Sequence, residues 1–195
     1  MEKQIVDKQT AEAVEILKKG GVIAYPTDTI YGIGCDALNQ RAIERVFKLK
    51  GRDYSKPLLI ACLDLKMIKK HANLPTRFEK MMNKILPGPY TILLNKKETI
   101  SDLVTAGLKK VGVRIPDNET CLKIIKEFGS PIITTSANIS GGAEVHSYQE
   151  LNIPVDFVVK GKCRYKQSST IFDPESKKIL RKGAQYNRLV NVLST

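Results

Sequence analysis

The stretch that decides the fold is Val22-Ile23-Ala24-Tyr25-Pro26-Thr27-Asp28-Thr29-Ile30-Tyr31-Gly32-Ile33-Gly34-Cys35-Asp36-Ala37. Its first four residues are apolar and predict a buried strand. The remainder is polar and rich in glycine, which predicts a loop leaving the end of that strand. Open α/β sheets bind ligands on loops of this kind. The stretch therefore predicts both a sheet and the position of a ligand site.

Helical and extended patterns alternate along the rest of the chain. The apolar spacing, caps and breakers predict helices over 10–19, 39–51, 64–72, 76–86, 118–128 and 186–193. Short apolar runs predict strands over 22–25, 58–62, 90–94, 111–115, 131–135, 157–159, 170–172 and 179–180. The fold class predicted is α/β or mixed α+β, without internal repeats or a linker.

Length and composition favour one ordinary domain over residues 1–195. With 42% hydrophobic residues, a chain of 195 can bury roughly 70% of its unfolded surface. No apolar run approaches the roughly 20 residues of a membrane span. The start Met1-Glu2-Lys3-Gln4 lacks the pattern of a secretory signal. We therefore expect a cytoplasmic protein without a membrane partner.

The chain is strongly basic, with 32 Lys and Arg against 20 Asp and Glu and a net charge of +12. Such an imbalance favours polyanionic partners. Charge alone leaves open whether the anion is RNA or a nucleotide.

The cysteines Cys35, Cys62, Cys121 and Cys163 are widely scattered and form no Cys-x-x-Cys pair. The two histidines lie near none of them in sequence. We expect free and mostly buried thiols, with neither a disulfide framework nor a metal site.

Gly32-x-Gly34-x-x-Ala37 formally matches the dinucleotide-binding fingerprint. That fingerprint requires its first glycine directly after a strand and a helix that opens at once. Here six residues follow the predicted strand, and the helix is expected only after Asn39. We therefore reject a Rossmann cofactor site.

Three cations, Lys50, Arg52 and Lys56, lie within seven residues at the end of a predicted helix. Basic residues are common there because they complement the helix dipole. The same cluster can also present point charges and a bidentate fork to phosphate oxygens. No Walker A sequence is present, so a nucleotide would need another scaffold.

Ser136 and Asn138 follow the apolar run 131–135 and precede Ser140-Gly141-Gly142. Hydroxyl, amide and glycine-exposed N–H groups suit phosphate recognition, although an ordinary turn or helix cap has the same composition. A nucleophilic role for Ser136 is disfavoured, because no Ser-x-x-Lys follows and His146 is isolated.

With these motifs in order, the chain resembles the YrdC-like family from about Ile16 to Ala184. The resemblance is carried by residues 25–32, 50–52, 86–91, 113–116, 135–141, 169–170 and 179–184, and includes the paired signature of Lys50 and Arg52 with Ser136 and Asn138. It implies the short, single-domain form, a twisted sheet with a concave electropositive face and no additional C-terminal domain.

The resemblance also implies a nucleotidyltransferase that condenses L-threonine, bicarbonate and ATP into threonylcarbamoyl-adenylate and pyrophosphate, for a transferase that modifies tRNA. By motif position, Thr29, Arg114 and Ser169 would contact threonine. The ATP-binding residues would be Arg52, Lys56, Ser136, Asn138 and Arg181. Catalysis would rest on Lys50 and Arg52, whose charges screen two anionic reactants without a covalent intermediate. Magnesium would arrive with ATP, and no tightly bound cofactor or resident metal is expected.

Two alternatives remain open. The chain could be a non-catalytic basic RNA-binding module of the same fold, and weak RNA binding is expected in either case. It could also be a carbamoyl-transfer relative, since similar domains occur within larger hydrogenase-maturation proteins. The neutral residues Thr29, Ser136 and Asn138 favour the enzyme, because plain phosphate binding does not need them.

Overall fold

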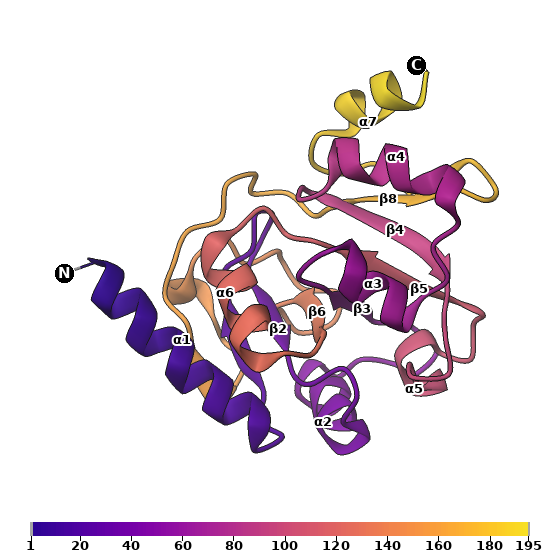
Figure 1. The fold of residues 1–195 in the computed structure, drawn as a ribbon. Coiled ribbons are helices and arrows are strands. Elements are labelled where there is room, and N and C mark those ends of the chain that lie inside the picture. Colours follow the sequence, from indigo (N-terminus) through magenta and orange to yellow (C-terminus); the bar gives the residue numbers. More distant parts are fainter. Residues whose placement is uncertain (1, 195) are drawn as a thin grey trace.

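The computed structural model describes residues 2–194, and these build one mixed sheet of nine strands (Figure 1). The strands are β1 (Ile23–Tyr25), β2 (Gly32–Gly34), β3 (Leu59–Ala61), β4 (Tyr90–Asn95), β5 (Lys110–Arg114), β6 (Ile132–Ser136), β7 (Phe157–Val158), β8 (Thr170–Asp173) and β9 (Lys178–Arg181). They lie in the order β7-β1-β2-β6-β3-β5-β4-β8-β9. The pairs β1–β7, β3–β5 and β4–β8 are parallel, and the other neighbours are antiparallel. This mixed sheet confirms the predicted fold class.

Helices pack at both ends and along the sheet. They are α1 (Glu2–Lys18), α2 (Gln40–Lys50), α3 (Leu65–His71), α4 (Thr76–Ile85), α5 (Asp102–Thr105), α6 (Glu119–Phe128) and α7 (Tyr186–Leu193), with a 3₁₀ turn at Tyr148–Glu150. Figure 1 shows α1 beside α6 at one end of the molecule and α4 beside α7 at the other. The single-domain organisation stays a prediction.

The core has two parts. The smaller part joins α1 to α6, where Ala13, Val14 and Leu17 pack with Ile124 and Ile125. The larger part extends under α2, α3 and α4 and includes Tyr31, Val46, Phe47, Ile60, Ile92 and Phe172, each at most 3% exposed. Burial of these side chains is the main term that holds the helices to the sheet.

The helix ends follow from local chemistry. Asn39 Oδ1 accepts a hydrogen bond of 3.2 Å from Ala42 N and caps α2, which ends where Gly51 adopts φ 55°. Asn118 caps α6 in the same way, with 3.0 Å to Cys121 N, and Gly129 ends that helix at φ 80°. Both caps were readable in the sequence, and both helix predictions are confirmed.

Helix α1 begins at Glu2, whereas the apolar pattern predicted a start at Thr10. The preceding turns carry only one apolar pair, Ile5-Val6, so the period that marks the core-facing residues begins only near Ala13. The short α5 and the 3₁₀ turn lie where no element was predicted, because helices of one turn carry almost no periodicity.

The polar stretch after Tyr25 contains strand β2, which the prediction of a continuous loop missed. Gly32 pairs with Tyr25 of β1 on one side and with Ser136 of β6 on the other. Glycine here permits close packing, because a Cβ on Gly34 would lie 2.2 Å from the carbonyl oxygen of Ile133. Gly32 and Gly34 are strand residues, whereas the dinucleotide fingerprint needs its glycines in a turn between a strand and a helix.

Replacing Gly34 by alanine is therefore expected to lower the free energy of unfolding by about 1–3 kcal/mol, through overpacking against the β6 backbone. The matched variant is Gly32→Ala in the same strand, whose added Cβ would meet its nearest neighbour at 3.4 Å. Denaturant unfolding of both variants checks the expectation. Equal losses would show that general strand propensity, rather than the Ile133 contact, sets the cost.

Cys35, Cys62 and Cys121 are buried free thiols, as predicted, and Cys163 is partly exposed. Burial raises the pKa of Cys121 to about 12, so this thiol stays protonated near neutral pH. Within residues 2–194, no three metal-binding side chains come together, and no helix is long and apolar enough to cross a membrane.

Candidate active site

A cavity of about 520 Å³ opens where β2, β6, β3 and β5 lie side by side. Five cationic side chains line it, namely Arg52, Lys56, Lys110, Arg114 and Arg181. Its described lining contains no carboxylate. Apolar side chains also line the cavity, namely Leu59, Leu93, Leu108, Ile171 and Leu180. The cavity can thus hold an anionic molecule that also carries an apolar part.

One end of the cavity is organised around Arg114, the last residue of β5. Its side chain is buried, and Nη1 donates a hydrogen bond of 3.1 Å to Thr29 Oγ1 while Nη2 pairs with the buried Asp28 carboxylate. Thr27 stabilises the turn, since its hydroxyl donates to the carbonyl of Ile30 at 2.7 Å. Thr29 and Arg114, both predicted for threonine, are therefore in direct contact.

Ser169 and Arg181 form the next part of the wall. Arg181 Nε donates to the Ser169 carbonyl at 2.9 Å, and Nη2 donates to Ser169 Oγ at 3.0 Å. Ser169 Oγ lies 2.8 Å from the hydroxyl of Thr91. Burial, and then the charge of Arg114, lowers the pKa of Arg181. A residue predicted for threonine and one predicted for ATP thus meet here.

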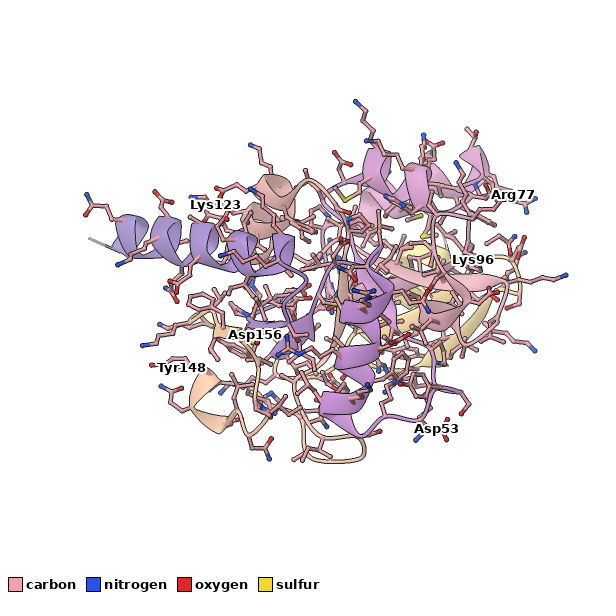
Figure 2. The ribbon with its side chains drawn as sticks, turned by 90° about the horizontal axis from the view of Figure 1, so that it is seen from below. Asp53, Arg77, Lys96, Lys123, Tyr148 and Asp156 are labelled. Atoms are coloured by element: carbon pink, nitrogen blue, oxygen red, sulfur yellow. The ribbon has the colours of Figure 1, made fainter. Side chains whose placement is uncertain are left out.

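Arg52 and Lys56 form a second rim of the cavity, on the turn that precedes β3, whereas Arg114 lies at the end of the parallel strand β5. Arg52 Nε donates to the carbonyl of Lys56 at 3.1 Å and Nη2 to that of Pro57 at 2.9 Å, so the guanidinium closes the turn after α2. Asp53 supports the same exposed turn, with its carboxylate accepting from Ser55 N at 2.7 Å (Figure 2). These side-chain contacts go beyond the dipole role that basic residues at a helix end ordinarily have.

Ser136 lies at the end of β6 and lines the cavity. Its hydroxyl donates to Asn138 Oδ1 at 2.5 Å, and Asn138 Nδ2 donates to the carbonyl of Gly142 at 2.5 Å. Asn138 is only 9% exposed and is not among the lining residues. In this structure it shapes the loop, whereas Ser136 faces the cavity.

Lys50 lies behind that loop. Its side chain is 1% exposed, and Nζ donates to the carbonyls of Ser136 and Asn138, the latter at 2.6 Å, and to Asn138 Oδ1 at 3.3 Å. Lys50 is absent from the cavity lining. These contacts let Lys50 position the Ser136 loop, and its predicted catalytic role stays a prediction.

Known proteins resemble this chain in both sequence and fold. The model of the Sua5/YciO/YrdC domain, whose description is telomere recombination, matches residues 15–183. The chain belongs to the Sua5/YciO/YrdC family. This confirms the family resemblance found in the sequence.

Members of the Sua5/YciO/YrdC family with assigned names cover most of this chain. A protein of Methanocaldococcus jannaschii, named provisionally as a threonylcarbamoyl-AMP synthase, is 38% identical in an alignment of 187 positions that covers 91% of this chain and 87% of that protein. A threonylcarbamoyl-AMP synthase of Vibrio vulnificus is 31% identical in an alignment of 180 positions that covers 88% of this chain and 97% of that protein. Both matches therefore cover most of this chain.

A solved Sua5/YciO/YrdC structure supports the same relationship. Sua5 of Pyrococcus abyssi, complexed with L-threonine, matches with a TM-score of 0.87 and 30% identity over 94% of this chain. The chain spans only 57% of that longer protein. The fold is therefore shared, and the relative's additional part has no counterpart in the match.

Two groups in this Sua5/YciO/YrdC site were not singled out from the sequence. Asp28 lies within the diagnostic stretch, but its partner Arg114 is 86 positions away. Lys110 lines the cavity while pairing with Asp173 at 2.8 Å and Glu175 at 2.7 Å. One feature of the sequence could have pointed to Asp28. It is an acidic residue shortly after a buried strand, and no basic residue lies near it in the sequence.

The Lys50 environment predicts a pH dependence of anion binding. Burial, and then the charge of Arg52, lowers the pKa of Lys50 to about 8. Below pH 8 the amine is charged and offers three donors, whereas above it one donor and the charge are lost. Affinity for tripolyphosphate should therefore fall by about 1 kcal/mol, roughly fivefold, as pH rises through about 8.

Calorimetric titration of tripolyphosphate between about pH 6.5 and 9.5 measures this pH dependence. The two limits lie about 1.5 units on either side of the Lys50 pKa. Lys50→Arg is the matched control, because a guanidinium stays protonated over this range. An identical pH profile in both proteins would contradict the assignment to Lys50.

Proposed function

We propose that the chain is a threonylcarbamoyl-AMP synthase, a nucleotidyltransferase that joins L-threonine, bicarbonate and ATP into threonylcarbamoyl-adenylate and pyrophosphate. The observation that carries the proposal is that the buried Arg114–Thr29 pair and the Arg52–Lys56 rim open into one cavity. The first suits an amino acid and the second a polyphosphate. The names of the relatives in the Sua5/YciO/YrdC family support the same activity.

The amino acid would bind at the Arg114 end. A guanidinium can pair with a carboxylate through two parallel N–H donors, and such charge-assisted pairs are stronger than neutral hydrogen bonds. Thr29 and Ser169 also line the cavity and add two hydroxyl groups to this subsite. The threonine complex of the Pyrococcus abyssi relative supports this choice of substrate.

ATP would bind across the other end. Arg52, Lys56 and Arg181 are the cations available to its phosphates, and Ser136 contributes a hydroxyl. The apolar side chains of Leu59, Leu93 and Ile171 provide a surface on which a purine can be buried. Asn138 and Lys50 support this end from behind the Ser136 loop.

The chemistry needs positioning and charge more than a nucleophilic side chain. The threonine amine joins bicarbonate to give a carbamate, with loss of water. A carbamate oxygen then attacks the α-phosphorus of ATP, the bond to the β-phosphate oxygen breaks, and pyrophosphate leaves. Both reactants are anionic, so Arg52 and Lys56 would reduce their repulsion and stabilise charge on the leaving group.

Magnesium would enter as part of the nucleotide substrate. The described lining of the cavity has no Asp or Glu side chain, which are the hard oxygen ligands that Mg²⁺ prefers. The residues present therefore suit a magnesium ion held mainly by phosphate oxygens and water, with ATP as its carrier.

The product is a reactive mixed anhydride, which a downstream tRNA threonylcarbamoyl transferase would consume in tRNA modification. The net charge of +12 supports additional weak and salt-sensitive RNA contact. The rival function, an RNA-binding module without catalysis, accounts less well for a cavity lined by both apolar side chains and the buried Ser169 hydroxyl.

Pyrophosphate release from ATP is expected to require threonine and bicarbonate together, because the attacking group forms only from both. The pure protein is incubated with ATP, labelled bicarbonate and one amino acid at a time, and the labelled acyl-adenylate is measured. Serine should be a poorer substrate, since losing one buried methyl group costs roughly 1 kcal/mol. ATP turnover that ignores the omission of threonine would refute the proposed function.

A further inference from the structure

Asp28 is a fully buried carboxylate next to the candidate amino-acid subsite. Its side chain is 0% exposed, and Oδ1 pairs with Nη2 of Arg114, which is itself only 6% exposed. Asp28 Oδ2 and Arg114 Nε are buried and have no hydrogen-bond partner within residues 2–194. The pair is therefore close but uses only part of the bonding capacity of either group.

A second Asp–Arg pair in the same chain shows what full pairing looks like. On the surface, Arg45 contacts both carboxylate oxygens of Asp156, each at 2.6 Å (Asp156 is labelled in Figure 2). In the cavity, by contrast, Arg114 divides its terminal nitrogens between Asp28 and the Thr29 hydroxyl. Two consecutive residues of one turn thus orient the guanidinium, whose residue lines the cavity.

Asp28 also changes the charge of this end of the cavity. A buried cation is tolerated when a counterion accompanies it, and together Arg114 and Asp28 carry no net charge. Among the residues whose burial the structure describes, the buried carboxylates are Asp28, which pairs with Arg114, and Asp173, which pairs with Lys110, so neither serves as a counterion for the Arg52–Lys56 rim. A zwitterionic amino acid can bind beside a neutral ion pair, whereas a polyphosphate gains much more at the rim.

We propose that Asp28 is a positioning and specificity-determining residue: it orients Arg114 toward the amino-acid carboxylate and, by neutralising it, keeps polyphosphate out of the amino-acid subsite. This inference rests on the proposed function for the identity of the two ligands. Asp28 acts through Arg114, since it is not itself among the lining residues.

The test variant is Asp28→Asn, which keeps the shape of the side chain and removes its charge. The KM for threonine should rise at least tenfold while the KM for ATP changes less than twofold, because Arg114 loses its charged anchor. Asp156→Asn is the matched control, since it also breaks an Asp–Arg pair, and its KM values should stay within twofold of the parent protein.

A binding measurement tests the charge role without turnover. In the parent protein, saturating tripolyphosphate should change the Kd for threonine less than twofold. In Asp28→Asn the two ligands should compete, with threonine affinity falling at least fivefold when tripolyphosphate is present. Asp28→Glu retains the charge and should restore independent binding, even where the longer side chain leaves the threonine KM raised.

The results separate four cases. Unchanged threonine KM and independent binding in a folded Asp28→Asn protein would overturn the inference. A lower melting temperature, with an unchanged threonine KM and with independent binding of the two ligands, would assign Asp28 a structural role. That result would overturn the inference as well. If the parent protein releases no threonine-dependent pyrophosphate, the proposed function fails, and the tripolyphosphate titrations still decide whether Asp28 excludes polyanions. Should Asp28→Asn not fold, the same titrations on Asp28→Glu decide, where competition between threonine and tripolyphosphate despite the retained charge would overturn the inference.

Discussion

Arg114→Ala is expected to weaken threonine binding by about 1.5–3 kcal/mol, roughly 10- to 150-fold, while ATP binding alone is nearly preserved. The ligand loses a charge-assisted pair at the buried end of the cavity. The variant should also lose about 3–5 kcal/mol of folding free energy, because Asp28 remains buried without a counterion. This is the largest stability effect expected from any single site residue.

Calorimetry with threonine and with ATP separates the two ligands, and denaturant unfolding measures stability. Arg45→Ala is the control, since Arg45 forms an exposed ion pair with Asp156 away from the cavity. Adding Asp28→Asn to Arg114→Ala should recover part of the lost stability, as the uncompensated charge is removed. Threonine affinity equal to that of the parent protein would show that the subsite is assigned wrongly.

Arg52→Ala is expected to produce the opposite ligand pattern, raising the Kd for ATP by about 30- to 100-fold, or roughly 2–3 kcal/mol. Two effects combine in this value. The phosphates lose a cation, and the turn after α2 loses hydrogen bonds from the guanidinium to the carbonyls of Lys56 and Pro57. Because that turn carries Lys56, its loosening removes a second cation from its place.

Arg52→Lys should recover only part of the affinity, since one ammonium group cannot reproduce the planar fork between two carbonyls. Arg41→Ala, which removes an exposed cation from the preceding helix α2, controls for the loss of one positive charge. If Arg52→Lys binds ATP as tightly as the parent protein, charge alone explains the effect and the role of the turn is wrong. Parallel losses of RNA affinity in the Arg52 and Arg114 variants, without ligand selectivity, would favour the RNA-binding alternative.

The predicted elements that depended on local signals were largely correct. Helix α2 has its cap at Asn39 and its left-handed stop at Gly51, and α7 runs from Tyr186 to Leu193 as expected. Strand β2 was missed because Gly32-Ile33-Gly34 has neither β-branched alternation nor length. Its strand conformation comes from pairing with β1 and with β6, which lies about a hundred residues later in the chain.

For the site, the sequence supplied the identities of its residues but not the part that each plays. Ser136 and Asn138 were grouped by spacing, yet only Ser136 faces the cavity while Asn138 shapes the loop. Lys50 was grouped with Arg52 by adjacency, but the helix end directs Lys50 inward beneath the Ser136 loop. Neighbours in sequence at the end of a helix can point to different sides of the chain, so adjacency does not predict a shared contact.

By itself, the sequence determined the fold class, most helix boundaries and the family, because capping groups, apolar periodicity and ordered motifs are properties of short segments. Only the tertiary structure decided that the guanidinium of Arg114 contacts both Asp28 and Thr29, and that Arg181 donates a hydrogen bond to Ser169. Those contacts join positions brought together by the order of the strands. Their geometry depends on sheet register and burial, which no local pattern encodes.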